Sequence, residues 1–159
     1  MDYESGVKML AEMMKKGRIC TFSTVNDLGQ ITSRPMTLQQ SEFDGDTWFF
    51  AARSSDKMQE ILTNPQVNIA FNSGNDWVSL SGSAEQVDDI DKMEELWNPV
   101  LQAWFPDGVA DPELTLIKVH AETAEYWDGA NKLVQLFGMA KAAITGEQAE
   151  LGNNNTIQL

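Results

Sequence analysis

The sequence has few of the residues that build metal centres and disulfide frameworks. Its 159 residues include one cysteine, Cys20, and one histidine, His120. A single cysteine excludes an intramolecular disulfide framework, and the two residues together are too few for a Cys-rich or His-rich metal site. Cys20 alternates with Phe22 in a strand pattern and is interpreted as a small buried hydrophobe. His120 alternates with Lys118 and is interpreted as a solvated strand residue.

Long apolar runs are missing as well. No segment approaches the roughly 18 consecutive apolar residues of a membrane-spanning helix, and the N-terminal segment Met1–Gly6 lacks a basic stretch followed by an apolar run. The single cysteine favours a reducing compartment. We therefore expect a soluble, cytoplasmic protein, and its length is that of one domain.

Positive charge is scarce and unevenly placed. Eleven Lys and Arg face 24 Asp and Glu, which gives a net charge of −13 and opposes binding to nucleic acid or to an anionic membrane. Residues 84–128 hold most of the excess, with two lysines and twelve acids, whereas residues 1–57 hold seven bases and eight acids. All three arginines precede residue 54. A bound small anion would therefore be held by the first third of the chain.

Hydrophobic periodicity and turn residues predict a mainly β protein of the α+β class. The expected elements are a helix over 7–16, strands over 18–25, 30–38 and 47–52, a helix from Ser55 to Asn64, strands over 66–72 and 77–87, an acidic helix over 88–104, a strand over 114–124 and a helix over 132–144. Short strands at hairpin spacing favour an antiparallel barrel, with the first three strands in hairpin connection. The domain is expected to cover residues 1–145, followed by a loose tail over 146–159.

The junction between strand 47–52 and the next helix is the first candidate site. A helix N-terminus offers unpaired N–H groups and the positive end of a dipole, and the hydroxyl of Ser55 and the ammonium of Lys57 add donors that suit a phosphate. The small residues Ala51 and Ala52 would let a planar ligand lie close to the strand. The alternative is an ordinary capped helix with a solvated lysine.

Arg34 is the second candidate. It stands in a strand pattern, where the alternative is a surface arginine that points to solvent. Antiparallel pairing of strands 30–38 and 47–52 across the Asp44-Gly45 turn would bring Arg34 near Lys57. The hypothesis of an anion site depends on that convergence. Trp127 lies beside a turn and is a candidate stacking surface.

Read together, several segments between about Met9 and Phe137 resemble the pyridoxamine 5′-phosphate oxidase-like, FMN-binding split-barrel superfamily. The resemblance is closest to its general stress protein 26 branch. The segments that carry it are Ser33-Arg34-Pro35-Met36, Ser55-Asp56-Lys57 through Ile61 to Asn64-Pro65, Gly82-Ser83-Ala84-Glu85 and Glu125-Tyr126-Trp127-Asp128-Gly129. Each segment is short, and their order and spacing make the case.

The resemblance implies a six-stranded antiparallel split β-barrel with Greek key topology, flanking helices and a homodimeric assembly. It implies that Arg34, Ser55 and Lys57 hold the phosphate of FMN, and that the flavin ring lies along strand 47–52 at the subunit interface. Trp127 would reach the flavin from the other subunit. The full set of implied cofactor-binding residues is Ser33, Arg34, Pro35, Met36, Phe50, Ala51, Ala52, Ser55, Lys57, Trp77 and Trp127.

Departures from the oxidases bear on activity. The oxidases have a lysine where this chain has Gln39, an arginine where it has Asp56, and a ring-contacting glutamine where it has Trp77. The Arg-Leu-His that grips the vitamin substrate is replaced by Lys132-Leu133-Val134. Loss of the histidine and of the arginine fork argues against pyridoxamine phosphate oxidase activity. The flavin site is retained in this comparison, and the substrate site is not.

The resulting hypothesis is an FMN-binding, general-stress-type flavoprotein that acts as a flavin-dependent oxidoreductase on an unknown substrate. No side-chain acid or base for the reaction is identified. Two alternatives stay open at this point. One is a non-catalytic protein that sequesters flavin, and the other is a superfamily member that binds a deazaflavin or haem. The electron donor is open too, because the sequence has no recognisable nicotinamide motif.

Overall fold

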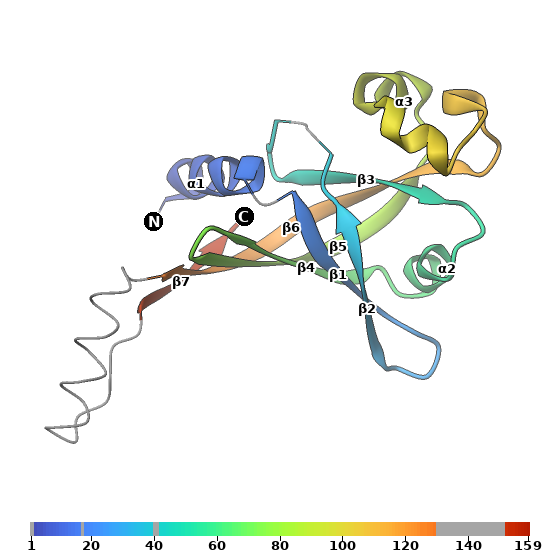
Figure 1. Ribbon diagram of the computed structural model, residues 1–159. Coiled ribbons are helices and arrows are strands. Elements are labelled where there is room, and N and C mark those ends of the chain that lie inside the picture. Colours follow the sequence, from blue (N-terminus) through green and yellow to red (C-terminus); the bar gives the residue numbers. More distant parts are fainter. Residues whose placement is uncertain (1, 17, 40–41, 130–151) are drawn as a thin grey trace, which may run out of the picture.

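The computed structural model describes residues 2–16, 18–39, 42–129 and 152–159 (Figure 1). The elements are α1 (Tyr3–Lys16), β1 (Ile19–Val25), β2 (Ile31–Thr37), β3 (Asp46–Ala52), α2 (Asp56–Thr63), β4 (Gln66–Ser73), β5 (Asp76–Val87), α3 (Ile90–Leu96), the 3₁₀ helices η1 (Pro99–Ala103) and η2 (Gly108–Ala110), β6 (Leu114–Gly129) and β7 (Gly152–Gln158). Six strands form one antiparallel sheet in the order β2-β1-β4-β5-β6-β3, and β7 pairs with β6. The mainly β class and the split-barrel architecture expected from the sequence are confirmed, with a seventh strand added.

Alternation along the strands builds the core. In β1 the side chains of Cys20, Phe22 and Thr24 point inward, while their neighbours are exposed or partly exposed. Phe22 meets Phe49 of β3 edge to face at a centroid distance of 5.0 Å. Helix α1 places Leu10 in the same core. A second, smaller core lies between the end of β3, the start of β6 and α3.

The connection between β2 and β3 is not the expected hairpin. β1 and β2 do pair as predicted, in a register that joins Val25 to Ile31. β3 instead pairs with β6, with Ala52 opposite Leu114, so β2 and β3 stand at opposite ends of the strand order. Leu38 and Phe43, which lie between the two strands, are both buried in the core. Burial of these residues is incompatible with a tight hairpin turn that projects into solvent.

The expected acidic helix over 88–104 is shorter than predicted. α3 ends at Leu96, and η1 begins at Pro99 after Asn98, which is extended. A proline disfavours the helical conformation in the residue before it, which here is Asn98, so the helix ends ahead of Pro99. Met93 and Leu96 are buried, whereas Ile90, Val100 and Trp104 are exposed.

The C-terminal residues differ from the expected loose tail. Residues 152–158 form β7, which pairs with β6 from Gly152↔Gly129 to Gln158↔Thr123. Ile157 is buried in the core and lies against Gly6 of α1. The loose-tail expectation is therefore corrected for this stretch. The predicted helix over 132–144 and the predicted domain limit at 145 lie outside the described residues.

Pro35 and Gly82 occupy strand positions that suit a proline and a glycine. Pro35 lies in β2, an edge strand, where its missing N–H interrupts no ladder on the outer side. Gly82 marks a register shift in the β5–β6 pairing, and a Cβ there would stand 2.0 Å from the carbonyl oxygen of His120. Within the described ranges, no helix is long and apolar enough to cross a membrane.

Candidate functional site

The motif residues of β2 divide between the two faces of the strand. Thr32, Arg34 and Met36 are half-buried, while Ser33 and Pro35 are exposed on the other face. Ser33 forms a hydroxyl pair with Ser23 at 2.7 Å across the hairpin. The predicted motif 33–36 therefore contributes Arg34 and Met36 to one surface and Ser33 and Pro35 to the opposite one.

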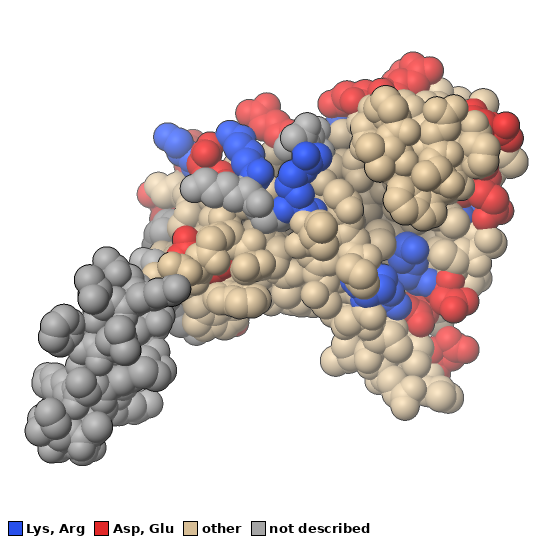
Figure 2. Space-filling view, in the orientation of Figure 1, with Lys and Arg blue, Asp and Glu red and all other residues tan. Residues whose placement is uncertain are grey.

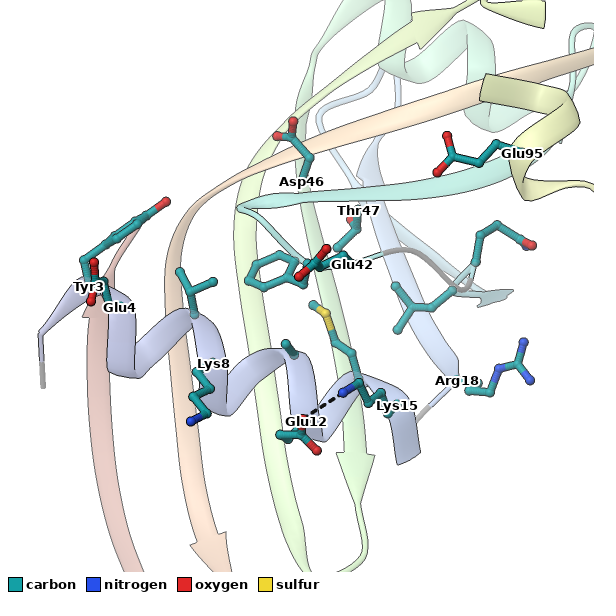
Figure 3. A pocket seen from close by; sticks show the side chains of 16 residues that line it. Tyr3, Glu4, Lys8, Glu12, Lys15, Arg18, Glu42, Asp46, Thr47 and Glu95 are labelled. Atoms are coloured by element: carbon teal, nitrogen blue, oxygen red, sulfur yellow. Dashed lines mark hydrogen bonds and ion pairs between the residues drawn. The ribbon is translucent and has the colours of Figure 1, made fainter. Parts of the chain in front are cut away.

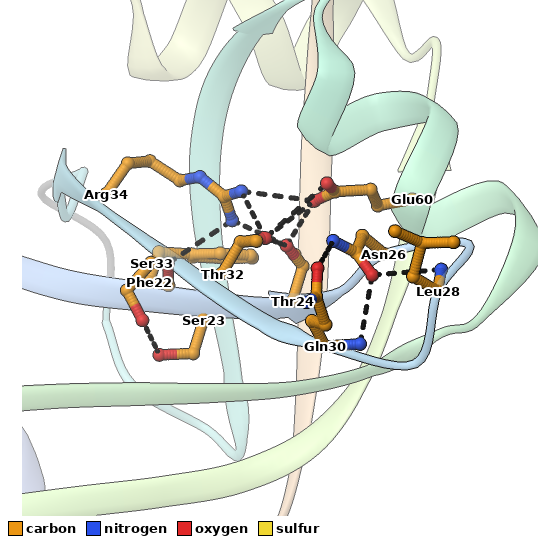
Figure 4. Close-up of polar contacts among 10 residues, drawn as sticks. All are labelled: Phe22, Ser23, Thr24, Asn26, Leu28, Gln30, Thr32, Ser33, Arg34 and Glu60. Carbon is orange, nitrogen blue, oxygen red and sulfur yellow. Dashed lines mark hydrogen bonds and ion pairs between the residues drawn. The ribbon is translucent and has the colours of Figure 1, made fainter.

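Arg34 is held in place by four acceptors (Figure 4). Its Nη1 donates to the carbonyl oxygen of Phe22 at 3.3 Å and to Thr24 Oγ1 at 2.6 Å. Its Nη2 donates to Thr32 Oγ1 and to Glu60 Oε2, each at 3.1 Å. The Arg34 side chain is 23% exposed, and its guanidinium is fixed between β1, β2 and α2.

Glu60 is a central residue of this cluster that the sequence did not single out. It lies on α2, forms the ion pair with Arg34, and accepts hydrogen bonds from the hydroxyls of Thr24 and Thr32. The hydrogen bond from Thr24 and the nearby charge of Arg34 lower the pKa of the Glu60 carboxyl despite its burial. Its spacing of three residues from Lys57 places both side chains on one side of α2. That spacing is the sequence feature that could have indicated Glu60 as a member of the site.

Lys57 lies one turn earlier on α2 and is half-buried. Burial and the positive charge of Arg34 lower its pKa, with Asp56 acting in the opposite direction. Within the part of the chain that the structure describes, Lys57 has no ion-pair or hydrogen-bond partner. Two cations thus converge, and within the described residues Glu60 forms an ion pair with Arg34, whereas Asp56 acts on Lys57 without forming one. The two cations meet because α2 packs on β1, and not through the expected β2–β3 pairing.

The N-terminus of α2 is assembled from the strand end before it. Ser55 is the N-cap residue, but its hydroxyl donates to the carbonyl oxygen of Ala52 at 2.7 Å and does not cap the helix. The first-turn N–H groups of α2 therefore lack a side-chain cap. Arg53 turns away from this point, because it forms a two-point pair with Asp88, each contact at 2.8 Å.

β3 offers its backbone rather than its side chains. Phe50 is buried in the smaller core, where its ring meets Trp97 edge to face, and Ala51 is buried in the main core. Gln39 donates its N–H to the carbonyl oxygen of Trp48 at 3.2 Å, on the side of β3 away from β6. Because backbone groups alternate along a strand, Phe50 and Ala52 direct their polar groups to that same edge.

Trp77 and Trp127 lie next to each other but away from this cluster. They are opposite residues in the β5–β6 pairing, and they are 57% and 38% exposed. Trp127 follows Leu114, the partner of Ala52, by thirteen positions on β6. That separation is about 43 Å along the strand at the usual rise per residue. Within one chain the structure does not bring the two tryptophans to Arg34 and Lys57.

Cys20 and His120 occupy the positions expected of them. Cys20 is buried, and burial raises the pKa of its thiol to about 12, so it is not a thiolate at neutral pH. His120 is exposed on β6, and its Nδ1 lies 2.8 Å from Asp46 Oδ1. Within the described residues, neither has a hydrogen bond or ion pair with Arg34, Lys57 or Glu60, although Cys20 stands opposite Met36, two cross-strand pairs along from Phe22 and Arg34.

A separate hollow of about 870 Å³ lies between α1, the connection before β3 and Glu95 (Figure 3). Its floor is apolar, and its rim carries both acids and bases, including the paired Glu12 and Lys15 at 2.8 Å. The hollow does not include Arg34 or Lys57. In the space-filling view, basic side chains gather over α1 and beside β2 and α2, and acidic ones line the α3 end (Figure 2).

Comparison with known proteins agrees with the fold. Residues 5–150 match the family described as pyridoxamine 5′-phosphate oxidase like. Protein bli-3 of Neurospora crassa is 33% identical over 133 residues, which covers 76% of this chain. The chain spans 64% of the length of that curated relative.

Two solved structures are similar over most of their length. A protein related to general stress protein 26, from Clostridium acetobutylicum, has a TM-score of 0.72 at 18% identity, covering 100% of this chain and 97% of that one. The general stress FMN/FAD binding protein of Xanthomonas citri has a TM-score of 0.66 at 26% identity, covering 79% of this chain and 89% of that one. The resemblance stated from the motifs is confirmed by these matches.

Proposed function

Because the chain belongs to the pyridoxamine 5′-phosphate oxidase-like family, we propose that it binds FMN in a homodimer and acts as a general-stress-type, flavin-dependent oxidoreductase. The observation that carries the proposal is the convergence of Arg34 and Lys57 beside the N-terminus of α2, with Lys57 half-buried and without a partner among the described residues. The flavin assignment is supported by the relative from Xanthomonas citri, which is described as an FMN/FAD binding protein.

The residues present fit a phosphate. A half-buried ammonium without a counter-ion is costly, and the lowered pKa of Lys57 reflects that cost. A phosphate dianion would supply the missing charge, and charge-assisted contacts of this kind are the stronger hydrogen bonds. The uncapped N–H groups at the start of α2 would add donors of the correct polarity. We assign Arg34, Lys57 and this helix end to the phosphate.

The edge of β3 fits a planar ring. Phe50 and Ala52 present backbone groups there, and Ala51 and Ala52 are small enough for close approach. When bound, FMN would supply hydride or electron transfer, and the protein would supply position and electrostatics. No acid or base of the chain is assigned to the chemistry.

The homodimer is supported by the placement of Trp77 and Trp127. Two large aromatic side chains, exposed side by side, are unusual on a lone subunit and typical of an interface. We propose that the partner subunit's copies of these residues face the flavin ring. We also place the protein in the cytoplasm, where a lone buried Cys20 is ordinary.

The oxidation of pyridoxamine phosphate is not proposed. Asp56 stands in the first turn of α2 where the oxidases have an arginine, and Arg53 cannot substitute for it because Asp88 engages both ends of its guanidinium. Gln39 likewise offers no positive charge beside β3. The chain is expected to hold flavin without holding the vitamin substrate.

Titration of the flavin-free protein with FMN, riboflavin and FAD tests the binding proposal. FMN should bind at one molecule per subunit and riboflavin at least tenfold more weakly, because riboflavin lacks the phosphate. Equal affinity for FMN and riboflavin would contradict it, and preferential binding of FAD would assign a different flavin. Stopped-flow reduction by NADH and NADPH then separates an oxidoreductase from a flavin-sequestering protein, for which neither donor reduces the bound flavin.

A further inference from the structure

The guanidinium of Arg34 has almost no donor left for a ligand. An arginine has five N–H groups, four of them on the two Nη atoms. Those two atoms face four acceptors, the Phe22 carbonyl, Thr24, Thr32 and Glu60, at 2.6 to 3.3 Å. Only the Nε–H is without an assigned partner in this structure. A ligand phosphate would therefore compete with these acceptors for the terminal nitrogens.

Among the four acceptors, Glu60 alone carries charge. Its side chain is 12% exposed, and its carboxylate receives hydrogen bonds from Thr24 and Thr32 as well as from Arg34. It lies one turn along α2 from Lys57, on the same side of the helix. A phosphate that contacts both Arg34 and Lys57 would thus have a buried negative charge close to it.

We propose that Glu60 limits the strength of phosphate binding by competing for Arg34 and by repelling the dianion. This inference rests on the proposed function, because it takes the FMN phosphate to lie at Arg34 and Lys57. With Glu60 ionised, the three side chains carry a net charge of +1, and without its charge they carry +2. Low exposure makes that difference matter, since charges near a protein interior are weakly screened.

Positioning of Arg34 does not depend on Glu60 alone. The Phe22 carbonyl, Thr24 and Thr32 together receive three of its four terminal contacts, and Thr24 is itself fully buried. Removing the charge of Glu60 should therefore leave the guanidinium in place and make it a better partner for phosphate. Glu60 is thus a residue that sets affinity, rather than one required to build the site.

The test compares FMN and riboflavin affinity, by calorimetry, in four proteins: the wild type, Glu60→Gln, Glu60→Asp and Glu94→Gln. Glu60→Gln keeps the size of the side chain and removes its charge. Glu60→Asp keeps the charge. Glu94, exposed on α3, gives the same change in net charge away from the site. If Glu60→Gln does not fold, Glu60→Met provides the uncharged variant without a buried polar group.

Glu60→Gln is expected to tighten FMN binding at least fivefold and to leave riboflavin binding within about twofold of wild type. Glu60→Asp and Glu94→Gln should retain the wild-type preference for FMN. An FMN-to-riboflavin affinity ratio that is unchanged or lowered in Glu60→Gln, in a protein whose wild type prefers FMN, would overturn this inference alone. A wild type with no preference for FMN would overturn both this inference and the proposed function.

Discussion

Arg34 of β2 and Lys57 of α2 are like charges that the fold brings together, and the charge of Arg34 is one cause of the lowered pKa of Lys57. Glu60 pairs with Arg34 at 3.1 Å, whereas Lys57 has no partner in the described residues. Like charges at a partly buried position are unfavourable unless an anion joins them. This relationship is the basis of the proposed phosphate site.

Replacement of Lys57 should weaken the binding of FMN more than the binding of riboflavin. Lys57→Ala removes a charge-assisted contact of about 1.5–3 kcal/mol, so the dissociation constant for FMN should rise about tenfold or more. Lys57→Arg keeps the charge and should retain most of the affinity. Riboflavin titrated into each variant is the control, and its affinity should change little. Unchanged FMN affinity in Lys57→Ala would remove Lys57 from the site.

Binding of FMN should weaken in alkaline solution. The pKa of Lys57 in the flavin-free protein lies below its ordinary 10.5, because of burial and Arg34. A bound phosphate raises that pKa, so binding takes up a proton once pH exceeds the flavin-free value. From about pH 7 upward, where the phosphate of FMN is a dianion, the affinity should thus be constant up to the flavin-free pKa of Lys57 and fall as pH rises through it. In Lys57→Arg this decline should vanish, because arginine stays protonated. A decline that persists in Lys57→Arg would assign it to another group.

Residues from two subunits should be needed for one flavin site. Lys57→Ala and Trp127→Ala should each bind FMN poorly when pure. A one-to-one mixture that exchanges subunits forms hybrid dimers with one intact site, so about a quarter of all sites should recover by random reassortment. The measurement is flavin bound per chain before and after mixing. Absence of recovery, with exchange verified by mass, would place Trp127 outside the site of the partner subunit.

The strand β7 should contribute to the stability of the domain. Ile157 is buried against α1, so Ile157→Ala should lower the free energy of unfolding by about 2–4 kcal/mol. Thr156 is exposed on the same strand and provides the matched control. Thr156→Ala should change the free energy of unfolding by less than about 0.5 kcal/mol. Urea unfolding measures both. Equal, small effects would return this segment to the loose tail expected from the sequence.

Local patterns predicted most of the elements. Periodicity and turn residues identified the strands β1 to β5 and the first part of β6, and the helix predicted from Ser55 to Asn64 is α2. The pairing of strands was harder to predict. β3 joins β6 because buried residues of the preceding connection carry it across the core, and no feature of the Asp44-Gly45 turn indicates that.

The parts that sequence reasoning missed depend on contacts between distant segments. Glu60 and Arg34 are 26 positions apart, and neither the strand pattern around Arg34 nor the helix pattern around Glu60 predicts their ion pair. β7 begins with Gly152 and three asparagines, which have low strand propensity, and it forms because β6 extends beside it and Ile157 is buried. The remoteness of Trp77 and Trp127 from the cluster also required the register of β5 and β6.

The absorption spectrum of the purified protein, followed by mass analysis of the ligand released on denaturation, tests the central claim most directly. The account predicts the visible bands of an oxidised flavin and release of FMN at up to one molecule per chain. If the protein is purified without flavin, the same bands should be retained after FMN is added and the excess removed. A protein that stays colourless after FMN is added, or that releases a deazaflavin or haem, would contradict the account.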